Sequence, residues 1–218
     1  MYRYKILEKV EPELWDSNLL KCDYSTFFQT HEYLNSLSAD GNSFPIFLQV
    51  VDDDNNVKAQ LGIKIWDSLK SASSGKINSI FNLFSKFGKR GSWVGGPIIH
   101  KQNNSDRILI LTLMIHAMEE IINKYELTIL DGYSPVQDFQ IDDIYLHEFK
   151  KSGFEIKNFF SFVTDLEQPI EKIWNSIHNS TQRDVKKAER RNIHVKELEN
   201  FNELEDYFLL NKTWAKTK

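Results

Sequence analysis

The hydrophobic and polar positions of this chain follow strand-like and helix-like periods in a definite order. In the first half, three segments rich in β-branched and aromatic residues are expected as strands, at 2–7, 44–51 and 57–66. The last two flank an acidic turn and should pair as a hairpin. Two short helices are expected before the hairpin, one with Pro12 in its first turn and one capped by Thr30. The first half therefore predicts an antiparallel meander.

In the second half, helical and strand patterns alternate. A strand at 92–99 is interrupted by Gly95, Gly96 and Pro97, which mark a bulge or an edge that another backbone or a ligand approaches. A long helix at 106–125, a short buried strand at 127–131, a helix at 143–151 ended by Gly153 and an aromatic strand at 154–166 should follow. The core face of the long helix is expected to consist of Ile108, Leu111, Ile115, Met118 and Ile122.

This alternation implies crossover connections between adjacent parallel strands. Together with the meander, it predicts a mixed α/β sheet with flanking helices. The apolar segment 80–87 is expected to be a short helix or the floor of a groove.

The most distinctive stretch is 170–195. Ile170, Ile173, Trp174 and Ile177 follow the i, i+3, i+4, i+7 spacing of one helix face. A polar break at 178–181 separates this helix from a second one at 182–192. The cap of the second helix is expected to be Asn179, Ser180 or Thr181. A strand should begin at 193–195.

The second helix concentrates positive charge on an otherwise acidic chain. From 183 to 196 there are six Lys or Arg against two acids, which gives +4; the whole chain carries -4, so the remainder carries -8. Such a concentration suggests an anionic ligand, because it raises the ligand's local concentration. The alternative is a solvated helix face on which Asp184 and Glu189 form local ion pairs.

Composition narrows the class of protein. The 218 residues are 41% apolar and 13% aromatic, enough for one large domain or for one domain and part of another. The start has no apolar signal core and no apolar run could span a bilayer, so a soluble, cytoplasmic protein is expected. The single Cys22 should be half-buried, and the three aspartates at 52–54 favour an acidic turn over a calcium loop. No metal site is predicted.

Three motifs resemble those of the FemAB/FemX-type aminoacyltransferases, and the order of elements resembles the GNAT acyltransferase fold. Residues 27–33 resemble the family's "FQS-x-E-W" element, and 95–99 its "GP-hydrophobic-hydrophobic" strand. Trp174 followed by 183–195 resembles the signature "W…R-x-x-hydrophobic-K-K-A-x-K/R-x-G-hydrophobic-x-V". The last match is the most specific of the three.

The resemblance implies two tandem GNAT-like domains. Residues 1–166 would be the first, and 167–218 would hold the basic signature helices and the start of an incomplete second, with the boundary at 167–169. It further implies an acyltransferase of peptidoglycan synthesis. Such an enzyme passes an amino acid from aminoacyl-tRNA, or an acyl group from acyl-CoA, to an amine on a cell-wall precursor, without a metal or bound prosthetic group.

The resemblance also places the candidate site. Transfer RNA and UDP-linked precursors are both polyanions, and an arginine fork suits phosphate. Matching positions make Arg183 and Lys187 the first phosphate-contact candidates, and the full substrate-binding set is Arg183, Lys186, Lys187 and Arg190. At i, i+4 and i+7 the first, third and fourth share one helix face, with Lys186 beside them.

No catalytic nucleophile and base can be paired from the sequence. His178 and His194 flank the basic helix and could act as bases, although a surface or packing role is favoured for both. Asp131 is expected to cap a helix or hold a turn, and Trp66, Trp93 and 159–160 are expected in the core.

Two departures from the family pattern concern single residues. Tyr33 replaces a tryptophan, and Asn192 replaces a glycine, which is tolerable because asparagine also adopts the left-handed conformation. A third concerns the donor: 90–96 has the letters of the acyl-CoA turn of GNAT proteins but runs into a strand and Pro97. Its glycines are therefore not expected at a helix N-terminus, where phosphate binding would need them.

Beyond Val195 only one helix is expected, at 201–213. The chain is then either the N-terminal portion of a transferase or a short member without the active site. The competing hypotheses are a non-catalytic module that binds a polyanion through 181–192, and a GNAT-like scaffold that pairs with another chain. Exposed apolar surface on 201–214 would support the scaffold.

Overall fold

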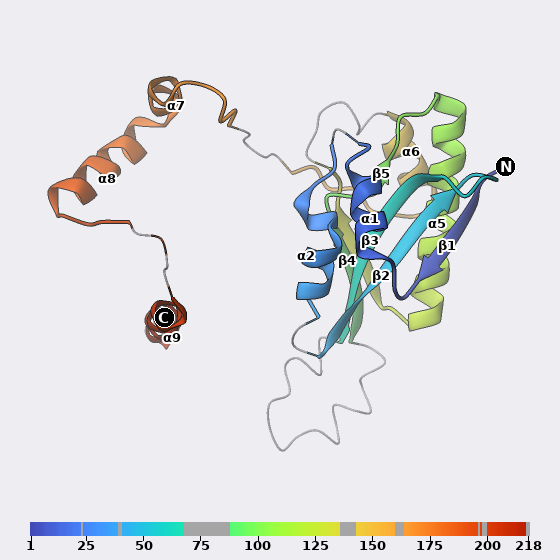
Figure 1. Ribbon diagram of the computed structural model, residues 1–218, viewed down its shortest axis with the longest axis horizontal. Helices are drawn as coiled ribbons and strands as arrows, with labels where there is room; N and C mark the ends of the chain where they lie inside the picture. Colours follow the sequence, from blue (N-terminus) through green and yellow to red (C-terminus); the bar gives the residue numbers. More distant parts are fainter. Residues whose placement is uncertain are drawn as a thin grey trace, which may run out of the picture. The chain divides into compact units, whose positions relative to one another are not determined.

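The computed structural model of the protein describes residues 1–22, 24–38, 41–67, 88–135, 143–159, 164–195, 197 and 200–216 (Figure 1). The chain divides into two compact units, Met1–Phe159 and Phe160–Lys218. The segment 80–87, expected as a helix or a groove floor, lies outside the described residues. Within the described part of the chain, no helix is long and apolar enough to cross a membrane.

The first unit is built on one mixed sheet (Figure 1). Its strands are β1 (Arg3–Leu7), β2 (Ser43–Val51), β3 (Val57–Asp67), β4 (Lys89–Val94), β5 (Ile98–Ile99) and β6 (Ile129–Tyr133). The order is β1-β2-β3-β4-β6, with β5 paired to β3 off this path. Strands β1 to β4 are antiparallel neighbours, whereas β6 runs parallel to β4. This confirms both the predicted meander and the predicted crossover.

Helices cover both faces of this sheet. On one face lie α1 (Pro12–Leu19), the 3-10 turn η1 (Phe27–Gln29) and α2 (His31–Ser36); on the other lie α5 (Asn104–Tyr125) and α6 (Asp143–Lys151) (Figure 1). Successive β2 residues point to opposite faces, so Ile46 and Leu48 pack in the core under α5 and α6, and Phe47 packs against Trp15 of α1. Thr30 caps α2 as predicted, since its side chain accepts from the Tyr33 amide.

The long helix α5 buries a wider face than its pattern predicted. Leu111, Ile115 and Met118 are buried as expected, but Ile108 is 41% exposed. The buried face also includes Ile110, Met114, Ala117 and Ile121. The helix is apolar around most of its circumference between 108 and 122, so periodicity alone does not specify which stripe meets the sheet.

Two strand predictions near the end of the first unit were wrong in detail. Strand β6 starts two residues later than expected, and Ile129 and Tyr133 are 44% and 58% exposed, because β6 is the outermost strand of the described sheet. Residues 154–159 form no strand, and 160–163 lie outside the described residues. Phe154 packs against the core, with its ring centroid 5.1 Å from that of Phe149.

The second unit is helical where it is described. It contains α7 (Ile170–Ser176), α8 (Asn179–Arg190) and α9 (Phe201–Lys216). The strand expected at 193–195 is absent: this segment has no ladder partner among the described residues and is exposed. That the second unit opens a further GNAT-like domain stays a prediction.

Candidate functional site

The sheet of the first unit opens at the carboxyl ends of β4 and β6. The two strands pair residue by residue up to Val94 and Tyr133. Beyond that point the chain turns at Gly95, whose φ of 67° favours glycine, and β5 then pairs with β3 instead of β6. The interruption predicted from the Gly-Gly-Pro run is therefore confirmed. In open α/β sheets such a divergence at strand carboxyl ends is where ligands bind.

A buried glutamine fills the gap along β3 between the stretch that pairs with β4 and the stretch that pairs with β5. The Gln29 side chain is fully buried; its Oε1 accepts from the Gly62 amide at 2.7 Å and its Nε2 donates to the Val94 carbonyl at 2.7 Å. The Trp15 indole donates to the Gln29 carbonyl at 2.7 Å. The Phe-Phe-Gln element thus replaces missing ladder bonds, and its role in this unit is structural.

Gly96, the residue after the turn, forms hydrogen bonds through both its amide and its carbonyl. The Gly96 amide donates to the Tyr133 carbonyl at 3.2 Å, across the opening. Its carbonyl accepts from the Trp93 indole at 2.9 Å and from the Tyr145 hydroxyl at 3.2 Å. A Cβ at this position would collide with Leu61. The backbone at the opening is therefore bound by the chain's own groups.

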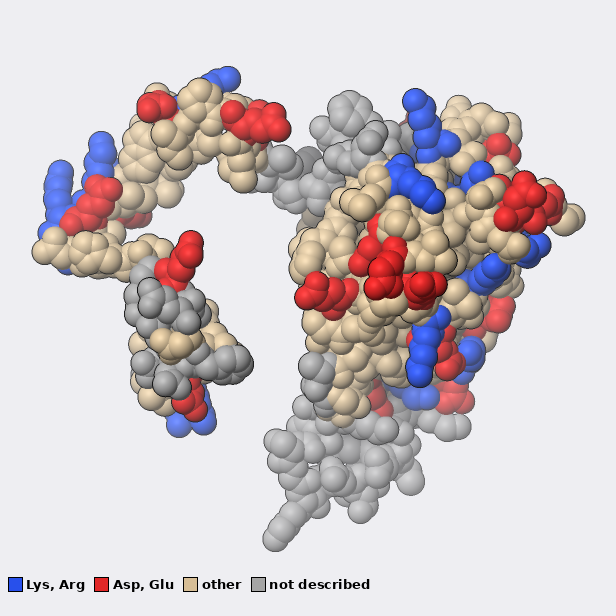
Figure 2. Space-filling view, in the orientation of Figure 1, with Lys and Arg blue, Asp and Glu red and all other residues tan. Residues whose placement is uncertain are grey.

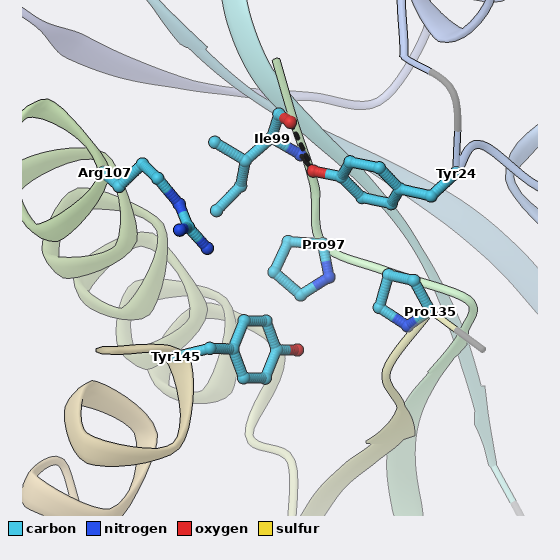
Figure 3. Close-up of a pocket in the computed structure, with 6 residues that line it drawn as sticks. All are labelled: Tyr24, Pro97, Ile99, Arg107, Pro135 and Tyr145. Atoms are coloured by element: carbon cyan, nitrogen blue, oxygen red, sulfur yellow. Dashed lines mark hydrogen bonds between the residues drawn. The ribbon is translucent and has the colours of Figure 1, made fainter. Parts of the chain in front are cut away.

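A small pocket lies beside this opening (Figure 3). It is lined by Tyr24, Pro97, Ile99, Arg107, Pro135 and Tyr145. The Tyr24 hydroxyl accepts from the Ile99 amide at 2.7 Å and donates to the Ile99 carbonyl. Burial raises the pKa of Tyr24 and of Tyr145 well above the ordinary tyrosine value. Both hydroxyls donate to backbone carbonyls, Tyr24 to that of Ile99 and Tyr145 to that of Gly96.

The described residues present no metal site. Among them, no group of three or more His, Cys, Asp and Glu side chains gathers in one place. The aspartates at 52–54 form the predicted hairpin turn, in which Asp52 pairs with Lys58 at 3.0 Å. Helix α5 begins only at Asn104, so the glycines at 95 and 96 do not sit at its N-terminus, as expected. Cys22 is buried, more deeply than expected, with its thiol 3.5 Å from the Ile99 carbonyl.

The basic helix α8 is joined to α7 by a defined corner. Its cap is His178, not one of the three residues predicted, because the helix begins at Asn179, three residues before the predicted start at 182. His178 Nδ1 accepts from the Ser180 amide at 3.3 Å. Gln182 Nε2 donates to the carbonyls of Trp174 at 2.9 Å and Ile177 at 3.0 Å, at the end of α7. These bonds satisfy groups that a helix end otherwise leaves unpaired.

The C-terminal end of α8 is a Schellman motif. Asn192 takes a φ of 54°, its amide donates to the Glu189 carbonyl at 2.9 Å, and the Ile193 amide donates to the Ala188 carbonyl at 3.1 Å. The left-handed residue is the one that occupies the glycine position of the signature. This confirms the expectation that asparagine is tolerated there.

The four substrate-binding candidates lie together on α8. Figure 2 shows Lys and Arg side chains in blue, with acidic side chains in red beside them, on the helical second unit. At 3.6 residues per turn, Arg183, Lys186, Lys187 and Arg190 fall within about 100° of the helix circumference. All four are exposed, and none forms an ion pair with any described residue. Within the same part of the chain, Asp184 and Glu189 form no ion pair either, so the local pairs of the alternative interpretation are not formed.

The remaining candidates have other surroundings. His178 is a helix cap and His194 is exposed beyond α8. Asp131 neither caps a helix nor holds a turn; it lies inside β6 and pairs across the sheet with Arg90 at 3.8 Å. Trp93 is in the core as expected, Trp66 is half-buried, and Phe159 is 71% exposed.

Sequence inspection missed the residues that line the opening. Tyr24, Arg107 and Tyr145 come from distant segments, and no local pattern links them. Gln29 lies inside a motif that was recognised, but the pattern does not reveal that its side chain bridges two strands.

Comparisons with known proteins add a likeness in fold. No protein-family model matches the chain, and no curated protein matches its sequence. It is similar to a solved aminoglycoside 6'-N-acetyltransferase from Acinetobacter baumannii, with 14% identity and a TM-score of 0.42, over 75% of this chain and 99% of that one. It is also similar to a probable acetyltransferase, with 13% identity and a TM-score of 0.43, over 74% and 99%. At these values the likeness says nothing about the reaction.

Proposed function

We propose that this chain is part of a FemAB-type acyltransferase that transfers an aminoacyl group to an amine on a phosphorylated cell-wall precursor. Support comes first from the arrangement of the first unit. It has an antiparallel meander, a crossover through α5 to a parallel strand, and a sheet that opens at the end of β4. This is the element order that the resemblance to GNAT acyltransferases implies.

The way the signature folds is compatible with the resemblance. Residues 183–190 lie in helix α8, which ends in a Schellman motif, and the left-handed residue is Asn192, where the family pattern has glycine. The left-handed conformation that favours glycine thus falls at the glycine position of the pattern, which supports the resemblance.

The observation that carries the proposal is the set of exposed cations on α8, which would supply its phosphate contacts. Arg183 and Arg190 offer planar forks that bind phosphate bidentately, and Lys186 and Lys187 add point charges. Because the described residues leave all four without ion-pair partners, a phosphate ligand would displace no existing bond.

The state of the sheet opening favours aminoacyl-tRNA over acyl-CoA as the donor for the first unit. The Gly96 amide and carbonyl are already bonded to Tyr133, Trp93 and Tyr145, and the pocket beside them is small. In the reaction, the acceptor nitrogen attacks the ester carbonyl, the ester C–O bond breaks, and the tRNA hydroxyl leaves with a proton. Such a transfer needs mainly positioning and stabilisation of the oxyanion.

The test is a transfer assay with charged tRNA and a UDP-linked precursor, read as a mass increase of the acceptor by one aminoacyl group. The proposal expects transfer that falls when Arg183 and Lys187 are both changed to glutamine. The matched control changes the exposed Lys9 and Lys101 to glutamine. Absence of any acceptor product with every charged tRNA supplied would overturn the proposal.

A second candidate is a partner-dependent module that binds a polyanion without catalysis. It is favoured by α9, on which five large apolar side chains are more than half exposed: Tyr207, Phe208, Leu209, Leu210 and Trp214. The consecutive run 207–210 points in all directions around the helix, a pattern typical of a helix that is buried on every side. Stable co-purification of a second chain without transfer activity would support this candidate.

A further inference from the structure

We infer that the α8 face binds the backbone of an RNA strand rather than the diphosphate of the acceptor. The inference rests on the proposed function in one respect: it takes this face of α8 as the phosphate-binding site. It then selects RNA over the UDP-linked precursor, the other polyanion of the proposed reaction. The face is the set Arg183, Lys186, Lys187 and Arg190.

The length of the face exceeds what a diphosphate can occupy. Arg183 and Arg190 are seven residues apart, so at 1.5 Å per residue their backbone positions are about 10 Å apart along the helix. Each strand of a nucleic-acid duplex carries one charge per about 3.4 Å of the helix axis, so the face covers about three such steps, which join about four consecutive phosphates. A nucleoside diphosphate offers two adjacent phosphates and would leave part of the face unoccupied.

The shape of the face also suits a strand. The four cations project from a convex helix surface, and α8 has no buried residue among those described. Small ligands are bound in concave pockets that cover most of their surface. The hollow found in the second unit lies on α7, lined by Ile170, Glu171, Trp174 and Asn175, and includes none of the cations. A backbone laid along the helix needs no such enclosure.

The opposite side of α8 argues against a membrane as the occupant. A helix that lies in a membrane interface inserts a broad apolar face. Here the far side offers Val185 and Ala188, and Val185 is only 37% exposed. Two small side chains give little area for insertion, whereas the basic side is wide and free of acids.

The helix is also held ready for binding. The His178 cap, the Gln182 bonds to the end of α7 and the Asn192 turn satisfy both helix ends. Binding therefore orders only the four side chains, since the backbone that carries them is already formed. A preformed surface loses less free energy on association than a segment that must fold.

The test measures binding of the full chain to fluorescently labelled tRNA by anisotropy, from about 50 to about 200 mM salt. If four cations contact a strand, the logarithm of affinity should fall with a slope of about -3 and affinity should drop about 60-fold over this range. Changing all four to glutamine, which keeps helix propensity, should remove most of that slope. The control variant changes the exposed Lys9, Lys101, Lys150 and Lys172 to glutamine and should retain it.

Competition separates the possible occupants. Uridine diphosphate at millimolar concentration should leave the RNA complex intact; full displacement at micromolar concentration would overturn the inference, as would an unchanged slope in the α8 variant. Tighter binding to anionic vesicles than to RNA would assign the face to a membrane and also overturn it.

The inference and the proposed function fail separately. RNA binding through α8 without aminoacyl transfer would refute the function and leave the inference standing. Transfer in which the α8 variant raises KM for the UDP-linked acceptor but not for charged tRNA would refute the inference and leave the function standing.

Discussion

Replacement of Gln29 by leucine tests whether a single side chain closes the gap between β3 and β4. Leucine has a similar size but offers no hydrogen bond. The Gly62 amide would lose its 2.7 Å acceptor and the Val94 carbonyl its 2.7 Å donor, both inside the protein. A buried group left unsatisfied costs about 1–3 kcal/mol, so the two together should lower the free energy of unfolding of the first unit by about 2–6 kcal/mol. Against a total of about 5–15 kcal/mol, this is a large fraction.

A matched control is available in β3, the strand that contains Gly62. Gln60 is also fully buried, but its Nε2 makes one 3.2 Å bond to the Trp15 carbonyl, and its Oε1 has no partner. Gln60→Leu removes one bond and one unsatisfied oxygen together. Its effect on the free energy of unfolding should therefore stay within about 1 kcal/mol of zero.

The assay is urea unfolding followed by hydrogen exchange of peptides from β3 and β4. Peptide-level exchange is needed because the chain has two units and one global transition is not assured. With a urea dependence of about 2 kcal/mol per molar, Gln29→Leu should lower the midpoint of the first unit by about 1–3 M. Equal losses in Gln29→Leu and Gln60→Leu would refute the bridging role.

Three further predictions concern other single residues. Asn192→Gly should leave α8 as stable or slightly more stable, whereas Asn192→Ala should destabilise its end by about 1–2 kcal/mol, measured as helicity by circular dichroism. Tyr145→Phe should lower the free energy of unfolding by about 1 kcal/mol, because Gly96 loses one donor while the aromatic packing remains; no change in urea midpoint would contradict this. Burial would raise the pKa of Asp52, but hydrogen bonds from Asn56 and Lys58 lower it to about 2. A depressed pKa stabilises the fold above the unfolded value near 3.8, and the gain is lost as pH falls towards about 2; Asp52→Asn should remove that part of the acid dependence of stability.

Local patterns were sufficient where local physics decides the structure. The hairpin, the helices with Pro12 and Thr30 at their starts, and the interruption at Gly95 depend on residues close in sequence. The exposure of β6, and the choice of which side of α5 is exposed, depend instead on the elements that pack beside them in the fold. An apolar run predicts a strand, but the position of that strand at the edge or in the middle of the sheet decides whether water reaches it.

The sheet opening shows the same limit at the level of the site. Its lining joins Tyr24, Ile99 and Tyr145, which are far apart in sequence and share no motif. Gln29 reaches Gly62 and Val94, separated from it by 33 and 65 residues. Such pairs become visible only once the strand order is known, because the need for a bridging amide arises from the interrupted ladder.

Two of the recognised motifs consist largely of residues that support the backbone. Gln29 of the first replaces ladder bonds, and Ala188, Asn192 and Ile193 of the signature form the end of α8. Neither role requires a ligand, so neither can distinguish a transferase from a scaffold with the same fold. The cations of α8 differ, since they form no ion pair with any described residue and a fold needs none of them. The proposed function is therefore best tested at those four charges, because their substitution can change binding without changing the helix that presents them.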